Sequence, residues 1–223
     1  MSLTDALGAA TRVQGVPKLR QSMQRFWKEH SAEPGAVAEA AAGVWRANPG
    51  DDGETSRMGA AIILGPAAVT VPDATEFLLD TVADDPGWRV QEALAKALDW
   101  RCEVQGWNAS LPTLEQWLGH PVANVRRAAA EGPRVWTRRP HFKDHPGEAL
   151  RLLGLVRGDD SDYVRKSVGN AISDISKSEP DLVLETLERW KAEGGTAPAV
   201  LRGACRKLRD THPDRTKGLL DGS

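Results

Sequence analysis

The chain is poor in residues on which several classes of protein depend. Its 223 residues include two cysteines, Cys102 and Cys205, which lack the CxxC spacing of a zinc site and are too few for a disulfide framework. The five histidines fall in loops or at helix edges, without a partnered nucleophile. We therefore expect buried thiols, no metal site, no cofactor and no catalytic histidine.

Long apolar runs and alternating strand patterns are also lacking. The longest apolar run, 60–71, contains Gly65 and Pro66 and falls well below the ~20 residues that a membrane helix needs. We read it as the end of a core helix. The N-terminus has no basic stretch followed by an apolar block, so we expect a cytoplasmic protein without a membrane span. Apolar residues return at three and four positions, which predicts a nearly all-helical chain.

One pattern occurs four times, with an apolar residue, then basic or polar residues, then an apolar or small residue four positions on. Its first residues are Val90, Val125, Val164 and Val200, which lie 35, 39 and 36 residues apart. This period is typical of stacked helical pairs. We predict one all-α, HEAT-like helical-repeat solenoid over 1–223, C-shaped with a concave face. The pattern covers 88–209, looser helices occupy 18–84, and 211–223 reads as a frayed tail.

Charge is distributed unevenly. Residues 1–117 hold 10 basic and 16 acidic side chains, whereas 118–223 hold 19 and 15. When the repeats are aligned by their first apolar residue, positions two, six and nine later share one helical face. From the second repeat on, that face carries the following residues: Arg127, Glu131, Arg134, Lys166, Asn170, Ser173, Arg202, Arg206 and Arg209. Such a basic stripe on the inner surface suits a nucleic-acid backbone.

Two carboxylates interrupt the basic residues. Glu131 lies between Arg127 and Arg134, and Asp174 lies three residues before Lys177. An acid in a cationic stripe repels phosphate, so it needs another purpose. One interpretation is an ordinary surface ion pair, worth about 0–1 kcal/mol. The other is a carboxylate that faces a developing positive charge.

Three segments together carry a resemblance to a known family. They are NVRRAAAEGPRVWTRRP (124–140), YVRKSVGNAISDISK (163–177) and PDLVLETLERW (180–190). They resemble the bacterial DNA alkylation repair family of HEAT-like repeat DNA glycosylases, the AlkC/AlkD group, and more its AlkC side. The resemblance implies that duplex DNA containing alkylated bases lies in the concave face. It also implies the release of N3- or N7-alkylated purines, with a carboxylate that stabilises the oxocarbenium-like sugar.

The motif match gives Glu131 and Asp174 as candidate catalytic residues, with Glu92 third. Candidate DNA-binding residues are Arg127, Arg134, Trp136, Arg138, Arg139, Lys143, Lys166, Asn170, Lys177, Arg202 and Arg206. In each helical pair we call the helix that carries the repeated pattern the second helix. Trp100 and Trp136 follow the ends of second helices and are candidates for contact with the lesion. Two other hypotheses stay open: a non-catalytic DNA-structure-binding protein on the same scaffold, and a protein-interaction solenoid. We expect a monomer.

Overall fold

The computed structural model describes residues 1–133 and 135–221, and within these the regular elements are all helices. The all-α prediction is therefore confirmed. None of the helices in these ranges combines the length and the apolar content that a bilayer span requires. The chain divides into two compact units, Met1–Gly106 and Trp107–Ser223. In a repeat protein each unit contacts mainly its neighbours, so a single domain can also divide in this way. The single-domain assignment therefore stays a prediction.

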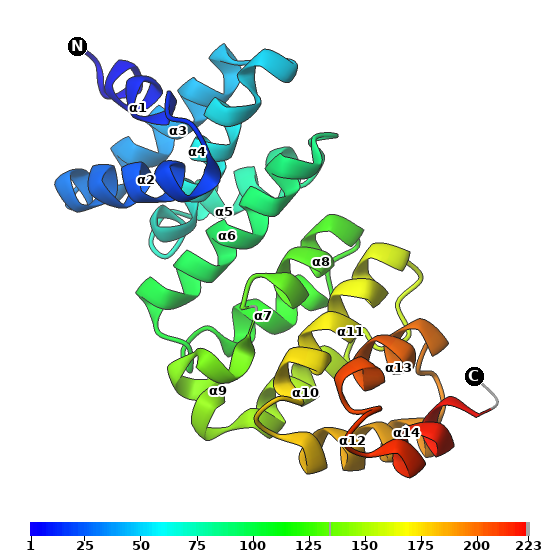
Figure 1. Ribbon diagram of the computed structural model, residues 1–223. Helices are drawn as coiled ribbons and strands as arrows, with labels where there is room; N and C mark the ends of the chain where they lie inside the picture. Colours follow the sequence, from blue (N-terminus) through cyan, green and yellow to red (C-terminus); the bar gives the residue numbers. More distant parts are fainter. Residues whose placement is uncertain (134, 222–223) are drawn as a thin grey trace. The chain divides into compact units, whose positions relative to one another are not determined.

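The first unit is organised around one buried helix (Figure 1). Its elements are α1 (Leu3–Thr11), α2 (Val16–His30), α3 (Pro34–Ala47), η1 (Asp51–Gly53), α4 (Glu54–Ala67), α5 (Pro72–Glu76), the π-helical η2 (Phe77–Val82) and α6 (Trp88–Gln105). Helix α4 is buried from Arg57 to its end and packs against α3 and α6. The apolar run with Gly65 and Pro66 is thus the end of a core helix, as predicted.

Gly65 sets the distance between α4 and α6. A Cβ atom placed on this glycine would lie 2.1 Å from the carbonyl oxygen of Ala97 in α6. Real Cβ atoms do not approach backbone atoms so closely. The two helices can pack at this separation only because position 65 has no side chain.

The second unit carries the later repeats. Its elements are α7 (Leu111–Leu118), α8 (Ala123–Glu131), η3 (Trp136–Arg138), α9 (Pro140–Asp144), α10 (Pro146–Gly154), α11 (Asp162–Ile175), α12 (Pro180–Glu193), α13 (Pro198–Ala204), η4 (Cys205–Lys207) and α14 (Pro213–Leu220). Proline stands in the first turn of most of these helices, where its missing N–H is not needed.

The first apolar residues of the four repeats are fully buried, as are the residues four positions later: Val90, Leu94, Val125, Ala129, Val164, Val168, Val200 and Ala204. They lie on α6, α8, α11 and α13. The repeat pattern therefore marks the packed faces of these helices, and the helical-repeat architecture is confirmed.

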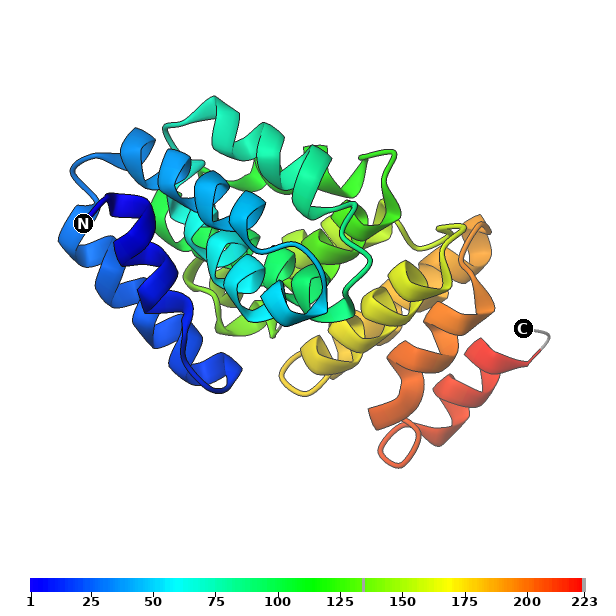
Figure 2. The same ribbon diagram turned by 90° about the horizontal axis from the view of Figure 1, so that it is seen from above.

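The predicted frayed tail is instead a docked helix. Thr216 and Leu219 of α14 are buried, and Figure 2 shows α14, in red, beside α13. Arg215 donates to both carboxylate oxygens of Glu188 on α12, at 2.8 Å each. Lys191 donates to the carbonyl of Gly218 at 2.7 Å, so a lysine of α12 satisfies the end of α14. These long-range contacts are not visible in the polar composition of 211–223.

We expect the substitution Gly65→Ala to destabilise the protein, because the added methyl group forces α4 and α6 apart. Overpacking of this kind costs about 1–3 kcal/mol. Gly147→Ala is the matched control, since a Cβ at Gly147 in α10 meets nothing within 4 Å. Urea unfolding should show a lower midpoint for Gly65→Ala alone. Equal midpoints for the two variants would contradict the close packing at Gly65.

Candidate nucleic-acid interface

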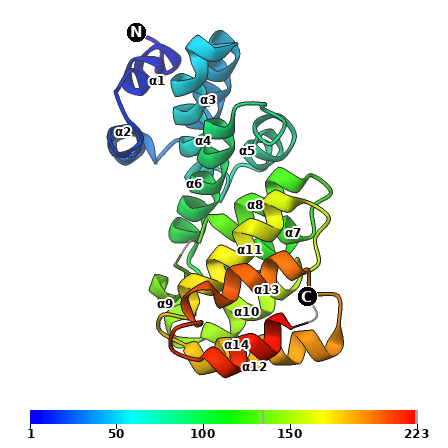
Figure 3. The same cartoon turned by 45° about the vertical axis from the view of Figure 1, so that its right-hand side comes forward.

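Three second helices of the second unit, α8, α11 and α13, lie side by side (Figures 1 and 3). Helix α11 is in the middle and packs against both neighbours. It approaches α13 closely where two glycines face each other, because a Cβ on Gly169 would lie 3.2 Å from the Cα of Gly203. The polar sides of the three helices consequently form one surface, which we call the second-helix surface.

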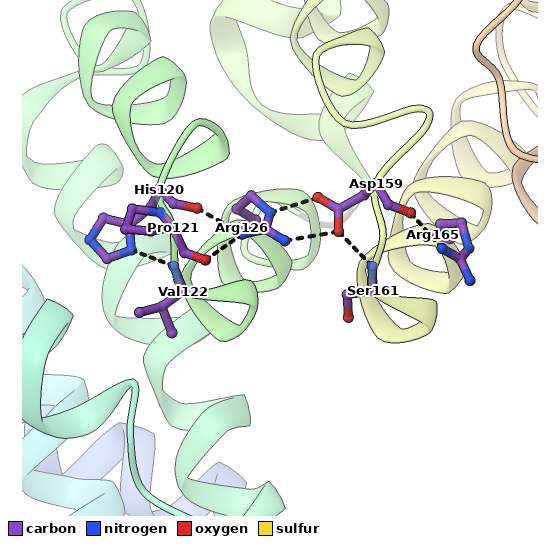
Figure 4. A network of polar contacts seen from close by, with 7 residues as sticks. All are labelled: His120, Pro121, Val122, Arg126, Asp159, Ser161 and Arg165. Atoms are coloured by element: carbon purple, nitrogen blue, oxygen red, sulfur yellow. Dashed lines mark hydrogen bonds and ion pairs between the residues drawn. The ribbon is translucent and has the colours of Figure 1, made fainter.

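A bidentate ion pair links helix α8 to the loop that precedes α11 (Figure 4). The Nε and Nη2 atoms of Arg126 lie 2.6 and 3.0 Å from the two carboxylate oxygens of Asp159. The same guanidinium donates to the carbonyls of His120 and Pro121, at 2.8 Å each. The fork geometry of arginine suits this arrangement. Through Arg126, the loop before α8 and the loop before α11 are therefore held together.

Asp159 also organises its own loop. Its carboxylate accepts a hydrogen bond from the Ser161 N–H at 2.8 Å, and its carbonyl accepts one from Arg165 (Figure 4). Burial raises the pKa of Asp159, but the hydrogen bonds from Arg126 and Ser161 outweigh it, and the pKa lies below its ordinary value. The carboxylate is thus ionised at neutral pH, and the helices that carry Arg126 and Arg165 are fixed relative to each other.

The predicted basic residues are accessible on the second-helix surface. Lys166, Arg202 and Arg206 are exposed, and Arg127 and Asn170 are half-buried. They come from α8, α11 and α13, which the packing described above places next to one another, and from η4, which continues directly from α13 and carries Arg206. The structure therefore groups these positions, and their contact with DNA stays a prediction.

Position nine of the repeat does not behave as predicted. Ser173 is fully buried in α11, and Asp99 is buried in α6, where its carboxylate lies 3.7 Å from Arg20. In α11, η4 packs against the helix and helps to cover this later turn. Arg209 is exposed, and Arg134 lies outside the described residues. The prediction that position nine belongs to the shared polar face is wrong for Ser173 and Asp99.

Asp174 occupies the last turn of α11 and is 8% exposed. One of its carboxylate oxygens, Oδ1, lies 2.6 Å from the Nζ of Lys207 on η4 and 3.3 Å from the Nζ of Lys177. The two lysines differ in accessibility, because the side chain of Lys207 is 32% exposed and that of Lys177 is 62% exposed. Two ammonium groups of different exposure thus contact one carboxylate oxygen.

Burial raises the pKa of Asp174, because a low-dielectric surrounding disfavours the charged form. The hydrogen bond and the charge of Lys207, followed by those of Lys177, act in the opposite direction and prevail. The pKa of Asp174 therefore lies below its ordinary value. The structure holds an ionised carboxylate at this position over the whole neutral range.

Asp174 lines an open pocket of about 430 Å³. Three predicted DNA-binding residues line the same pocket: Arg138, Lys143 and Lys177. They come from η3, α9 and the chain just after α11, so the fold brings together residues that are up to 39 positions apart in the sequence. The pocket combines the buried carboxylate of Asp174 and a second, half-buried carboxylate, Glu179, with three accessible cations.

Val135, which also lines this pocket, has a strained backbone. Its φ of 57° and ψ of 58° lie in the left-handed region, which a β-branched residue rarely adopts. Strain of this kind persists only where the surroundings enforce it, and it concentrates at functional sites. The buried ring of Trp136, the next residue, provides such an anchor.

The other two predicted carboxylates are placed differently. Glu131 is the last residue of α8 and is half-buried, and Glu92 is half-buried in α6 of the first unit. Neither is among the residues that line the pocket around Asp174. Asp174 is thus the one predicted carboxylate that the structure joins with this group of basic side chains.

Both candidate lesion-contact tryptophans belong to the core. Trp136 has no exposed surface, donates its indole N–H to the carbonyl of Ala130 at 3.3 Å, and packs 4.8 Å from Phe142 between ring centroids. Trp100 is 6% exposed, and its ring lies 6.3 Å from that of Trp27. The expected contacts of Trp100 and Trp136 with DNA are therefore wrong for this structure. Trp100 does not follow a helix end as expected, because α6 continues to Gln105.

Arg139 is half-buried, and its guanidinium lies 5.1 Å from the ring centroid of Trp107. A cation stacked on an indole stabilises the fold. Arg138 and Lys143 are exposed. Arg139 thus helps to anchor the segment that carries Arg138 and Lys143, and its contact with DNA stays a prediction.

Sequence reasoning missed Lys207, the nearest partner of Asp174. A continuous α-helix would place it on the same face as Val200, seven residues earlier, and thus toward the core. Helix α13 ends at Ala204, however, and the tighter turn of η4 rotates the following side chains. The pair of basic residues Arg206 and Lys207 was the only signal in the sequence.

Metal and thiol chemistry find no support in the part of the chain that the structure describes. No group of three or more His, Cys, Asp or Glu residues there could hold a metal ion. Both cysteines are buried, as expected, and burial raises the pKa of the Cys205 thiol to about 11. A thiol of this kind is unreactive at neutral pH.

Known proteins share this architecture. A structure of AlkD2 from Streptococcus mutans is 35% identical, with a TM-score of 0.80, and the match covers 92% of this chain and 98% of that one. The protein smu.31 of Streptococcus mutans UA159 is 35% identical, with a TM-score of 0.78 and coverage of 91% and 98%.

Two further relatives match less fully. The Pseudomonas fluorescens alkylpurine DNA glycosylase AlkC, bound to DNA containing an abasic site analog, is 22% identical with a TM-score of 0.51 over 98% of this chain and 65% of that one. This likeness shows the fold alone. The uncharacterized protein YhaZ of Bacillus subtilis strain 168 is 36% identical over 96 residues, which are 41% of this chain and 27% of that relative.

The match to AlkD2 is stronger than the match to AlkC in both identity and TM-score, which goes against the expected leaning toward AlkC. The group as a whole is supported. A family model described as DNA alkylation repair enzyme matches residues 13–208, which include the repeats and the pocket around Asp174. The chain belongs to the DNA alkylation repair enzyme family.

Proposed function

We propose that the protein is a DNA glycosylase of base excision repair that releases cationic N3- or N7-alkylated purines from duplex DNA. The observation that carries this proposal is Asp174, an ionised carboxylate in an open pocket whose other charged wall residues include Arg138, Lys143 and Lys177. Membership of the repair enzyme family supports it. A protein that only bound phosphate would gain affinity from a neutral or basic residue at position 174.

The chemistry of these lesions needs a carboxylate more than an acid. An N3- or N7-alkylated purine already carries a positive charge, so the base takes the electron pair of the glycosidic bond and leaves as a neutral molecule. The positive charge then develops on the sugar at C1′, where water adds and loses a proton. A fixed anion stabilises this transition state and can orient the water. We assign this role to Asp174, with Glu131 as the second candidate and Glu92 as the third.

DNA binding is assigned to the second unit on the basis of charge. Residues 107–223 hold 19 basic and 16 acidic side chains, a net of +3, whereas residues 1–106 hold 10 and 15, a net of −5. Lys166 and Arg202 are exposed on the second-helix surface, and Arg206 is exposed on the adjoining η4. Each phosphate contact adds affinity without reading sequence, because it releases condensed counterions.

The same ion pairs favour a second candidate function, a non-catalytic DNA-structure-binding protein. A carboxylate that already contacts Lys207 and Lys177 has a structural role in joining α11 to η4. Such a protein would bind DNA through the second-helix surface and leave the glycosidic bond intact. Measurement of base release separates the two functions.

The purified protein should release N3- and N7-alkylated purines from duplex DNA that has been treated with a methylating agent, as identified by chromatography. We expect Asp174→Asn to lower the single-turnover rate of release about a hundredfold or more, because a preorganised electrostatic contact is lost. Its affinity for DNA should be unchanged or higher, since an anion has been removed.

Asp162→Asn is the matched control, because Asp162 lies on the same helix and forms an exposed ion pair with Arg165. It should release bases at the normal rate. DNA binding without base release by the unmodified protein would favour the non-catalytic alternative. Normal release by Asp174→Asn would move the assignment to Glu131 and then to Glu92.

The rate of release should not depend on titration of Asp174 between about pH 5 and pH 8. Its folded-state pKa lies below the ordinary value near 3.9, so the charged form persists throughout this range. The stability contributed by its ion pairs is present above that ordinary value and is lost only as the pH falls through the lower, folded-state pKa. Single-turnover rates across this range test the expectation. A rate that falls with one protonation near pH 6 would contradict it.

Reversal of two charges on the second-helix surface, Lys166→Glu with Arg202→Glu, should weaken binding to undamaged duplex DNA. The plot of log affinity against log salt should also flatten by about 0.9 for each phosphate contact that is lost. Fluorescence anisotropy at several salt concentrations provides the measurement. Lys28→Glu, an exposed lysine of α2, is the control and should leave the slope unchanged. An unchanged slope in the double variant would exclude this surface.

A further inference from the structure

The two lysines that contact Asp174 are not equivalent. Lys207 approaches Oδ1 to 2.6 Å from η4 and is mostly shielded, whereas Lys177 lies 3.3 Å away and is largely exposed. An exposed ammonium–carboxylate pair contributes little free energy, because water competes with it. A shielded pair at hydrogen-bond distance is harder to separate, because both groups would be left partly desolvated. Lys207 is therefore a permanent partner of Asp174, and Lys177 is an exchangeable one.

The ammonium group of Lys177 could also bind an anion in the pocket instead of Asp174. It lines the same pocket as Arg138 and Lys143, and all three side chains are exposed. Ser178 and Thr137 add hydroxyl groups to the pocket wall, with their oxygens 3.3 Å apart. Three cations and two hydroxyls are donors that suit one tetrahedral dianion or a phosphodiester, and the cations outnumber the two carboxylates of the wall, Asp174 and Glu179. An anion here would attract Lys177 away from Asp174.

We propose that this pocket binds a phosphate group and that Lys177 exchanges from Asp174 to the phosphate, while Lys207 stays with Asp174. The identification of this phosphate with one in the DNA backbone rests on the proposed function. In free protein Lys177 partly neutralises the carboxylate. When DNA is bound, that neutralisation is withdrawn, so Asp174 presents more negative charge at the time when a cationic sugar forms nearby.

The phosphate site and the exchange can be tested without base excision. Inorganic phosphate is titrated into the full-length protein, and the pKa of Asp174 is followed by NMR of its side-chain carboxyl carbon. Phosphate should bind and should raise the pKa of Asp174, because an ammonium group that lowers it has moved to the anion. Phosphate binding that leaves this pKa unchanged would overturn the exchange, and the absence of any binding would overturn the site.

Lys177→Met separates the exchange from the simple proximity of an anion. In this variant the pKa of Asp174 should be raised before phosphate is added, and phosphate should then raise it less than in the unmodified protein. Phosphate affinity should fall about tenfold, the loss expected for one charge-assisted hydrogen bond. Lys217→Met, at an exposed position on α14, is the control and should match the unmodified protein in each respect. An equal phosphate response in Lys177→Met and the unmodified protein would contradict the proposal.

These outcomes can be distinguished from failure of the proposed function. If the protein binds phosphate and exchanges Lys177 but releases no alkylated base, the phosphate site stands and the glycosylase assignment is wrong. A protein that releases bases without a phosphate response at Asp174 retains the glycosylase assignment and loses the exchange.

Discussion

The contact between Asp174 on α11 and Lys207 on η4 joins two elements that pack against each other. Packing alone would not keep the Asp174 carboxylate ionised. Burial alone would raise the pKa of the carboxyl group and favour its neutral form. The ammonium group at 2.6 Å reverses this effect and keeps the carboxylate ionised. Removal of either partner would leave a charge in a partly desolvated place, which is more costly than the loss of a surface pair. The ionised state of Asp174 therefore depends on its ammonium partners, of which Lys207 approaches more closely than Lys177.

The surrounding stack supplies the rigidity that such a contact needs. The pair of Arg126 and Asp159 ties α8 to the loop before α11, and the facing glycines Gly169 and Gly203 allow α11 and α13 to approach closely. Because η4 continues directly from α13, a close and fixed α11–α13 contact also places Lys207. The repeat architecture thus does more than form a surface. It determines where a single carboxylate meets its partner.

The parts of this arrangement that could be predicted from the sequence are those with helical periodicity. Val125, Val164 and Val200 were identified as buried because apolar residues at spacings of three and four must face a core. Lys166 and Arg202 were identified as accessible for the same reason. The carboxylate Asp174 was suggested by a motif match together with the anomaly of an acid among basic residues.

Helical periodicity did not predict the side-chain directions in irregular segments. Trp136 lies in η3, where no fixed period relates position to direction, and its indole is buried in the interior. Arg139, directly after η3, is half-buried and lies over the ring of Trp107. Lys207 was missed because a change from α-helix to a tighter turn rotates the side chain out of its expected direction. The helix α14 was missed because its stability comes from contacts with α12, far away in sequence. The local sequence pattern does not indicate these tertiary contacts.

A crystal structure of the protein bound to duplex DNA that contains an abasic-site analogue would test the central claim most directly. The measurement is the position of the abasic sugar relative to the Asp174 carboxylate. The account predicts that the sugar faces this carboxylate, with a neighbouring phosphate between Arg138, Lys143 and Lys177. A complex in which the abasic nucleotide lies on a surface that does not include Asp174 would contradict it.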